Sequence, residues 1–321
     1  MEIGSFIELQ FEKGKEHFRG EKDIARLNSG RAAIYHAFRV TGCKRIWLPI
    51  YQCETVRNFL KRKGIQIMYY HIDSAFNPID IEQEKADAVL LVNYFGIMSF
   101  SRMNNLADRY KNVIIDDSQS FYAKPLPNCL NVYSCRKFFG VPDGAYVVGK
   151  NAHLFVEEYE QCYSSDTSLY LLQRIEYGCE GKAYKSKIEN DERIDVEDVK
   201  KMSKLTRIIL DSIDYEEAKQ KRLQNFHYLC EKLNSKNLLD MNNVDETVVP
   251  MIYPFLINDD ALIDRLQKHK HFQGRWWSYI LKETNKEDFE FVLSKYLIPL
   301  TIDQRYTNDN MDYICKLIVG N

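Results

Sequence analysis

Residues 133–148, YSCRKFFGVPDGAYVV, place the lysine Lys137 between two apolar runs of strand-like composition. Burial beside another cation lowers the pKa of a lysine, and only the neutral amine can condense with an aldehyde to form an imine. Lys137 is therefore a candidate for covalent chemistry, and the Ser134 hydroxyl is a candidate phosphate contact. Gly140 and Gly144 permit the turn into the second run. Serine and lysine at this spacing are common by chance, so a surface lysine after a strand is the alternative.

A second stretch, NVIIDDSQ at residues 112–119, has the composition of a short buried strand that ends in carboxylates. Enzymes with alternating strands and helices place their chemistry at such strand ends. A carboxylate there can hold the proton on a pyridine nitrogen, and the cationic ring then accepts the electron pair released when a substrate C–H bond breaks. Asp116 suits that task, although an aspartate that merely ends a strand would look the same.

A third stretch, LNSGRAAIYHAF at residues 27–38, is a turn of small residues that opens into a helix-like apolar pattern. The free N–H groups at the start of a helix bind phosphate. Ser29 is a candidate cap, and Gly30 lets the backbone come close to an anion. Taken alone, a helix cap without a ligand is the simpler explanation of this stretch.

Together the stretches follow the order phosphate turn, strand-end aspartate and lysine after a further strand. This order resembles the fold-type I enzymes that use pyridoxal 5'-phosphate (PLP), and within them the DegT/StrS family of sugar aminotransferases. Members of that family carry a Ser-Gly-Thr-x-Ala-like turn, an Asp-x-x-Gln pair, and a serine and a lysine followed by Gly-Gly. The likeness runs from about residue 28 to 148 and more loosely over the whole chain. It implies an α/β fold with a mostly parallel mixed sheet flanked by helices and a smaller C-terminal α+β domain.

The resemblance also implies a role for each matching residue. The phosphate turn would consist of Gly30, Arg31 and Ala32. Asp116 would hold the proton of the pyridine nitrogen, and Gln119 would lie beside the phenolic oxygen of PLP. Ser134 would bind the phosphate and Lys137 would form the imine. Lys137 and Asp116 would be catalytic. We prefer Asp116 to Asp117 because only Asp116 stands three residues before Gln119, and adjacent residues of a strand point to opposite faces.

Three positions depart from the family pattern. Arg31 replaces the usual threonine, and its side chain could make a charge-assisted contact to phosphate or point into solvent. Cys53 lies near the position where many relatives place an aromatic ring over the cofactor, so we expect it beside the cofactor, where a thiol cannot stack. Ala145 replaces the second glycine.

The composition agrees with an enzyme that acts on small molecules. The chain has 321 residues, enough for two linked domains, and its formal net charge of −2 gives no electrostatic footprint for nucleic acid or an anionic membrane. No apolar run approaches the roughly 18 residues of a membrane span. The eight cysteines are scattered and no signal peptide is visible, so we expect reduced thiols in the cytoplasm. The seven histidines lack metal-ligand spacing, so we predict no metal.

Strand-like and helix-like segments alternate along the first half of the chain. Strands are expected at 45–48, 65–70, 88–92, 113–115 and 145–148, with helices near 54–63 and 101–110. Such alternation favours a mostly parallel sheet with helices on both faces. We expect a large PLP-binding domain with an N-terminal arm at residues 1–210 and a small domain at 211–321, joined by a helix at 215–236. The charged stretch 182–204 is expected to be a solvated surface.

Substrate contacts are expected at two further places. Asn93 follows the third strand at the same edge of the sheet and is expected to line the site. Arg275, Trp276 and Trp277 could hold an anionic group and stack on a sugar or nucleotide, while packing between the domains explains them equally well.

The resemblance implies transamination by a homodimer, because fold-type I sites commonly lie at the subunit interface. Lys137 would release the aldehyde to an amino donor, commonly glutamate, and then move a proton between substrate carbon and cofactor. The implied acceptor is a keto-sugar, often nucleotide-linked. Two alternatives stay open. One is a non-catalytic PLP-fold regulator or scaffold, and the other is an acyl-transferase or hydrolase with Ser134 as nucleophile and Lys137 as base, for which no Ser-Asp-Asn or Lys-Thr-Gly partner motif is present.

Overall fold

The computed structural model describes residues 7–320 and contains an eight-stranded sheet in the order β1-β8-β7-β6-β5-β2-β3-β4. The neighbouring strands from β3 through β2, β5 and β6 to β7 are parallel, whereas β1–β8, β7–β8 and β3–β4 are antiparallel. The strands are β1 (Ile24–Leu27), β2 (Arg45–Pro49), β3 (Gln66–Ile72), β4 (Pro78–Ile79), β5 (Asp87–Val92), β6 (Val113–Asp116), β7 (Leu130–Ser134) and β8 (Ala145–Val148). This mixed sheet with a parallel centre confirms the predicted fold class.

The central strands bring their carboxyl ends to one edge of the sheet. Every residue of β5, β6 and β7 is buried, as expected for strands that are covered on both faces. Val92 at the end of β5 lies opposite Asp116 at the end of β6, and Asp116 lies opposite Val132 near the end of β7. The loops that follow these strands therefore start from neighbouring points.

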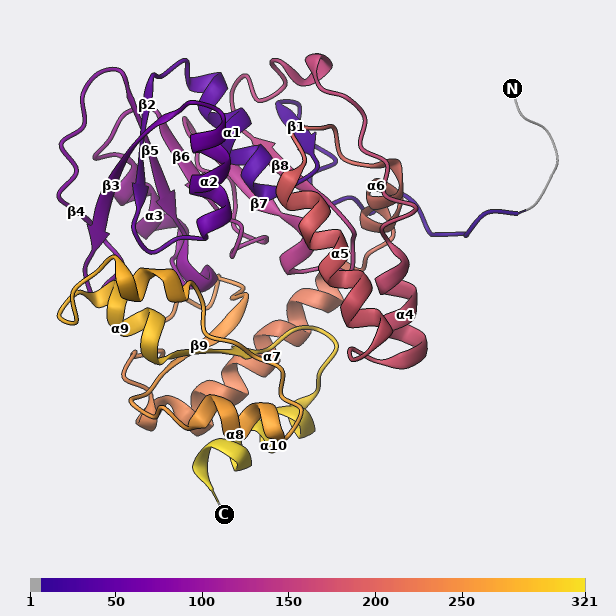
Figure 1. The fold of residues 1–321 in the computed structure, drawn as a ribbon, viewed down its shortest axis with the longest axis vertical. Helices are drawn as coiled ribbons and strands as arrows, with labels where there is room; N and C mark the ends of the chain where they lie inside the picture. Colours follow the sequence, from indigo (N-terminus) through magenta and orange to yellow (C-terminus); the bar gives the residue numbers. More distant parts are fainter. Residues whose placement is uncertain (1–6, 321) are drawn as a thin grey trace.

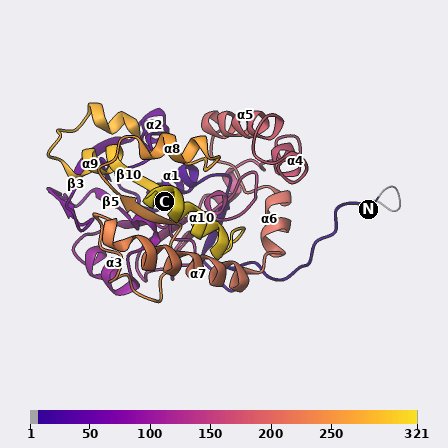
Figure 2. The ribbon, with the colours of Figure 1, turned by 90° about the horizontal axis from the view of Figure 1, so that it is seen from below.

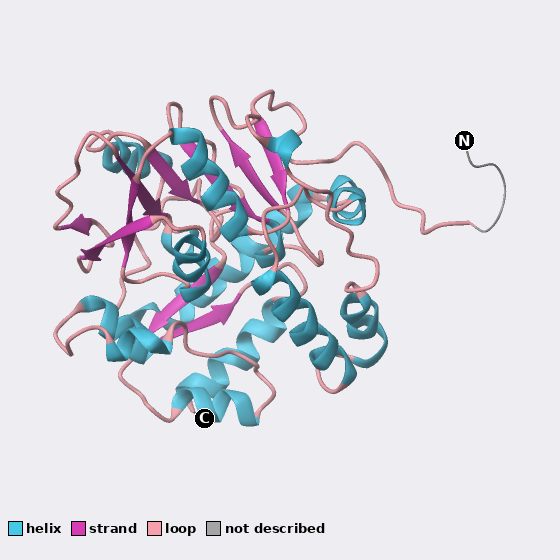
Figure 3. Ribbon diagram, turned by 45° about the horizontal axis from the view of Figure 1, so that its top comes forward, coloured by secondary structure: helices cyan, strands magenta, loops and turns pink. Residues whose placement is uncertain are grey.

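Helices cover both faces of this sheet. α1 (Gly30–Thr41) and α2 (Glu54–Arg62) pack against each other on one face, and α3 (Phe100–Ala107) lies on the opposite face (Figures 2 and 3). α1 is capped at its start by Ser29, whose Oγ accepts a hydrogen bond from the Ala32 N–H, and it ends at Gly42, whose φ of 67° favours glycine. The cap fixes the point at which the helix N-terminus meets the ends of the strands.

The chain after β8 forms a helical hairpin beside the sheet rather than another strand. Its helices are α4 (Leu169–Tyr177) and α5 (Lys182–Val196), followed by α6 (Lys204–Asp211) (Figure 1). α4 has no buried residue, and α5 buries only Ala183, Asn190 and Ile194. The expected solvated surface over 182–204 is thus correct for much of α5, but one side of the hairpin faces a cavity, as described below.

The C-terminal part packs below the sheet around a two-stranded antiparallel sheet (Figure 1). α7 leads into it and matches the helix expected at 215–236. Its elements are α7 (Tyr215–Leu233), β9 (Ile252–Leu256), α8 (Leu262–Lys268), α9 (Phe289–Tyr296), β10 (Leu297–Thr301) and α10 (Asn308–Val319). The predicted smaller α+β domain is therefore present, while its division from the large domain at residue 210 stays a prediction.

Short 3₁₀ turns complete the described chain: η1 (Tyr94–Gly96), η2 (Cys135–Lys137), η3 (Val156–Glu158), η4 (Asn234–Lys236) and η5 (Ser278–Lys282). None of the helices within residues 7–320 has both the length and the apolar composition needed to cross a bilayer.

Candidate active site

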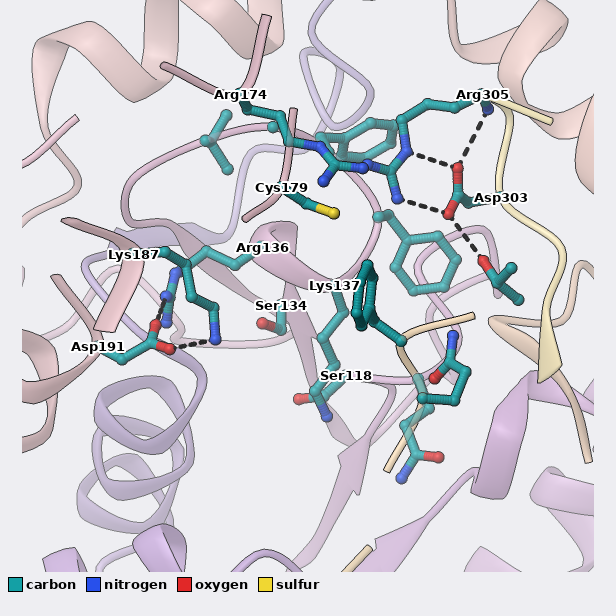
Figure 4. Close-up of a pocket in the computed structure, with 18 of the residues that line it drawn as sticks. Ser118, Ser134, Arg136, Lys137, Arg174, Cys179, Lys187, Asp191, Asp303 and Arg305 are labelled. Carbon is teal, nitrogen blue, oxygen red and sulfur yellow. Dashed lines mark hydrogen bonds and ion pairs between the residues drawn. The ribbon is translucent and has the colours of Figure 1, made fainter. Parts of the chain in front are cut away.

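A cavity of about 1090 Å³ lies at the carboxyl ends of the parallel strands (Figure 4). It is bounded by the sheet, by the α4–α5 hairpin and by the C-terminal part. Seven of the residues predicted from the sequence line it: Gly30, Arg31, Cys53, Asp116, Gln119, Ser134 and Lys137. Ala32, Asn93, Arg275 and Trp276 are not among the lining residues.

The start of α1 forms a small polar cup together with two serines from other loops. A Cβ atom placed on Gly30 would lie 3.4 Å from the Ser118 Oγ and 3.7 Å from the Ser134 Oγ, so glycine brings the backbone close to both hydroxyls. Within residues 7–320 the N–H groups of Gly30 and Arg31 donate to no protein acceptor. Free N–H groups at a helix start, joined by two hydroxyls, are the donors that a phosphate group requires. The cup therefore fits the phosphate end of PLP.

The predicted turn residues Ala32 and Arg31 both have their polar groups paired within the protein. The Ala32 N–H is used by the helix cap, since it donates to the Ser29 Oγ at 3.3 Å. The guanidinium of Arg31 is buried and forms an ion pair with Asp195 on α5. Arg31 therefore neither points into solvent nor keeps an unpaired charge for phosphate. Its charge is paired with Asp195 on α5.

The two adjacent aspartates face different surroundings. Asp116 lines the cavity, and its Oδ1 accepts a hydrogen bond from the Ser118 N–H at 3.0 Å. Asp117 points into the protein, where its Oδ1 accepts from the Asn93 amide at 3.1 Å. Burial raises the pKa of Asp117 well above its ordinary value, an effect that the Asn93 hydrogen bond opposes and the charge of Asp116 adds to. Asn93 also donates to Ser120 at 2.9 Å, so it anchors this inner carboxyl and does not line the cavity.

Lys137 occupies the end of η2, three residues after β7, and its side chain is exposed to the cavity rather than buried as expected. It makes no hydrogen bond or ion pair with any residue from 7 to 320. The next carbonyl, that of Phe138, is held from the C-terminal part by the Gln304 amide at 2.8 Å and by Arg222 at 3.4 Å. The lysine amine is thus free while its backbone is fixed.

Arg222 on α7 is a buried cation that joins the two parts of the molecule. Its side chain is 1% exposed, and its guanidinium lies 4.5 Å from the Phe138 ring and donates to Gln304 at 3.0 Å. Burial lowers the pKa of Arg222 to about 10. Because it lines the cavity, Arg222 adds fixed positive charge beside the loop that carries Lys137.

Gln119 and Cys53 also line the cavity. The Gln119 Oε1 accepts the Phe95 N–H at 2.9 Å, which ties its side chain to η1. Gly96 follows with a φ of 74°, and a Cβ there would come within 2.5 Å of the Gln119 carbonyl, so this close approach requires glycine. Cys53 precedes α2, and its Sγ lies 3.1 Å from the Thr55 Oγ1.

Arg275 packs within the C-terminal part, whereas Trp276 packs against η1 of the N-terminal part. Arg275 donates to the carbonyls of Lys295 and Asp259, and the Trp276 ring lies 5.8 Å from the ring of Phe95. Packing between the two parts thus describes Trp276, whereas Arg275 is held by carbonyls of its own part. It is the neighbouring Trp277 that lines the cavity.

The α4–α5 hairpin supplies lining residues that the sequence analysis missed. We call the following set the helical cover: Tyr170, Arg174, Tyr177, Cys179, Lys187 and Asp191. No local motif marks them, because they lie within a charged, tyrosine-rich stretch that resembles ordinary surface. Ser118, in contrast, could have been found, since it lies between Asp116 and Gln119 in the second motif.

The described part of the chain, residues 7–320, contains no group of three or more His, Cys, Asp or Glu side chains arranged to hold a metal ion.

Comparison with known proteins identifies the fold. A sugar aminotransferase from Micromonospora echinospora is 15% identical with a TM-score of 0.60, and the match covers 94% of this chain and 88% of that one. A DegT DnrJ EryC1 StrS aminotransferase from Brucella abortus is 13% identical with a TM-score of 0.61, covering 95% and 87%. The E. coli GDP-4-keto-6-deoxy-D-mannose-3-dehydratase, crystallised with hydrated PLP, is 16% identical with a TM-score of 0.61, covering 93% and 88%.

These matches show that the chain shares the fold of these proteins, which is the fold that the sequence motifs predicted. No protein-family model matches the sequence, and a search of curated proteins finds no match either.

Proposed function

We propose that the protein is a PLP-dependent aminotransferase that transfers an amino group from glutamate or a similar donor to a keto-sugar. One observation carries this proposal: the polar cup at Gly30, the carboxylate of Asp116 and the free amine of Lys137 converge on one cavity. Their order in the sequence matches the motif order of the family, and proteins of similar fold are named as sugar aminotransferases.

Each residue has a defined task in this proposal. When bound, PLP supplies an electron sink for the pair released from a substrate C–H bond. Gly30, Ser118 and Ser134 bind the phosphate, and Asp116 keeps a proton on the pyridine nitrogen. Lys137 holds the cofactor covalently through its amine and, once the amino donor has displaced it, moves the proton at the substrate carbon.

An anionic, nucleotide-linked acceptor is supported by the free charge of Arg174. This side chain lines the cavity from the helical cover and forms no ion pair with any of the residues described, 7 to 320. The other basic residues at this end, Lys270 and Arg305, are paired with Glu180 and Asp303. Arg174 is therefore available for a phosphate group of the acceptor.

The acyl-transferase alternative is disfavoured by the geometry. A serine nucleophile needs a hydrogen bond to its base, and none joins Ser134 to Lys137 within residues 7–320. A visible absorption band that appears with PLP and disappears on borohydride reduction separates this alternative from a PLP protein. Turnover of glutamate with a panel of keto-sugars then separates an enzyme from a scaffold. A PLP-loaded protein that converts no donor to its keto acid would contradict the aminotransferase proposal.

A homodimer is supported by an apolar face on α4. Leu169, Leu172 and Ile175 are spaced three residues apart and are 50%, 52% and 80% exposed, a pattern that suits contact with a second copy. Light scattering of the PLP-loaded protein tests this, and an active monomer of 37.9 kDa would contradict it. All eight cysteines are free thiols, which supports the reducing cytoplasm as its location.

A further inference from the structure

Two cations share one carboxylate beside the polar cup. Arg136 stands two residues after Ser134, and Lys187 reaches the same place from α5. Both pair with Asp191, and the Lys187 Nζ lies 2.5 Å from its Oδ2. All three side chains line the cavity, and Figure 4 shows them on the far side of Ser134 from Lys137.

This cluster carries an uncompensated positive charge. Burial by itself would raise the pKa of Asp191, but the hydrogen bond from Lys187 and the charge of Arg136 hold that pKa below its ordinary value. Asp191 is therefore ionised and neutralises one of its two partners. The Nε of Arg136 is buried and has no hydrogen-bond partner within residues 7–320. The cluster therefore keeps one unused N–H donor, on Arg136, and one positive charge that no carboxylate in the described chain neutralises.

The polar cup lacks the charge that its proposed ligand needs. Gly30, Ser118 and Ser134 offer neutral donors, whereas a phosphate monoester carries a charge of about −1.5 to −2 at neutral pH. Arg31 cannot balance that charge, because Asp195 already pairs with it. The Asp191 cluster has two cations for one carboxylate, and its Arg136 stands two residues after Ser134 in the same cavity.

We propose that Arg136 and Lys187 form a side-chain half of the phosphate-binding site, in which Asp191 is the internal counterion that holds the two cations in place. This assignment rests on the proposed function and extends it to α5. It gives the helical cover a role in cofactor affinity, since α5 would be tied to the phosphate end of the cofactor through Lys187.

The test compares PLP with pyridoxal, which has the same ring and aldehyde but no phosphate. Arg136→Met and Lys187→Met keep most of each apolar stem and remove the charge. Each should raise the dissociation constant for PLP roughly tenfold, as expected when one charge-assisted hydrogen bond is lost, and leave that for pyridoxal unchanged. Absorbance titration of the apoprotein measures both constants. Lys185→Met is the matched control, because Lys185 is an exposed lysine on the same helix that does not line the cavity.

Unchanged PLP affinity in both variants, or an equal loss for PLP and pyridoxal, would overturn the assignment. Lys187 is exposed, so Lys187→Met tests the idea even if Arg136→Met does not fold. A wild-type protein that binds neither compound would instead contradict the proposed function. In that case inorganic phosphate tests the cluster alone: the rise in unfolding temperature that phosphate produces should shrink in Lys187→Met, and an undiminished rise would overturn the assignment.

Discussion

The two walls of the cavity are built on different principles. On one side, Gly30, Asp116, Ser134 and Lys137 come from strand ends and a helix start, where backbone hydrogen bonds fix their positions. On the other side, the helical cover reaches in with long side chains from α4 and α5, which bury almost nothing of their own. The first wall is suited to covalent and proton chemistry, and the second to binding charged groups. Substitutions on the two walls should therefore have different consequences.

The sharpest contrast is between Lys137 and Lys187, one lysine from each wall. Lys137→Ala should abolish turnover and the visible band at any PLP concentration, because no other side chain replaces the amine. Lys187→Ala should weaken PLP binding, and its turnover should recover as PLP is raised. Steady-state kinetics across a PLP series measures both. Residual turnover in Lys137→Ala, or its recovery with PLP, would erase the distinction between the walls.

The next largest effect is expected within the strand-end wall, at the paired aspartates. Asp116→Asn should leave the fold intact and slow proton transfer at the substrate carbon by several orders of magnitude, where each factor of ten corresponds to about 1.4 kcal/mol of transition-state stabilisation. Asp117→Asn should keep most activity, because its carboxyl is buried away from the cavity against Asn93. Single-turnover rates with glutamate decide between them. The reverse order of effects would mean that Asp117 contacts the cofactor.

On the helical cover, Arg174→Ala should act on the acceptor alone. Losing one charge-assisted contact should raise KM for a nucleotide-linked keto-sugar roughly tenfold and leave KM for glutamate unchanged. Glu176→Ala is the control, because Glu176 is an exposed residue of α4 that does not line the cavity. Equal KM values for the acceptor in Arg174→Ala and wild type would remove this residue from the substrate site.

The smallest effect concerns stability rather than catalysis, at His36 in α1 behind the polar cup. Burial lowers the pKa of His36 below its ordinary value of 6.5, and the hydrogen bond to the Ala152 carbonyl only partly opposes this. The unfolded chain then binds more protons than the folded one just below pH 6.5, so stability is complete above this pH and falls as the pH drops.

In His36→Gln the fall in the free energy of unfolding between pH 7 and pH 5 should be shallower than in wild type. Urea denaturation at a series of pH values measures it, with the exposed His227→Gln as the control. An equally steep fall in His36→Gln would assign this pH dependence to other groups.

The same contrast explains how much the sequence could predict. The strand-end wall lies in short motifs, so Gly30, Asp116, Ser134 and Lys137 could be located from local pattern and resemblance. Asn93 and Trp276 show where this fails, because each lies next to the site in sequence but its side chain turns into the protein. In a strand, side chains alternate between the two faces, so it can be predicted that only one of Asp116 and Asp117 faces the site. Trp276 and Trp277 lie in an irregular loop, where no such alternation predicts which ring faces the cavity.

The helical cover was beyond reach of the sequence for a different reason. Arg174, Lys187 and Asp191 meet the cavity only because the α4–α5 hairpin folds back over the strand ends, and that placement depends on long-range packing. A polar surface helix and a helix that lines a polar cavity have the same composition. The motifs that carry the resemblance end near residue 148, and the looser likeness beyond them gave no guide to individual residues of this segment.

The most direct test of the central claim is to find which residue binds the cofactor covalently. The PLP-loaded wild-type protein is reduced with borohydride, digested, and its peptides are analysed by mass spectrometry. We expect one pyridoxyl-modified peptide, carrying the modification on Lys137. Modification of Lys187 or another lysine in place of Lys137, or no modified peptide at all, would contradict the assignment of this site.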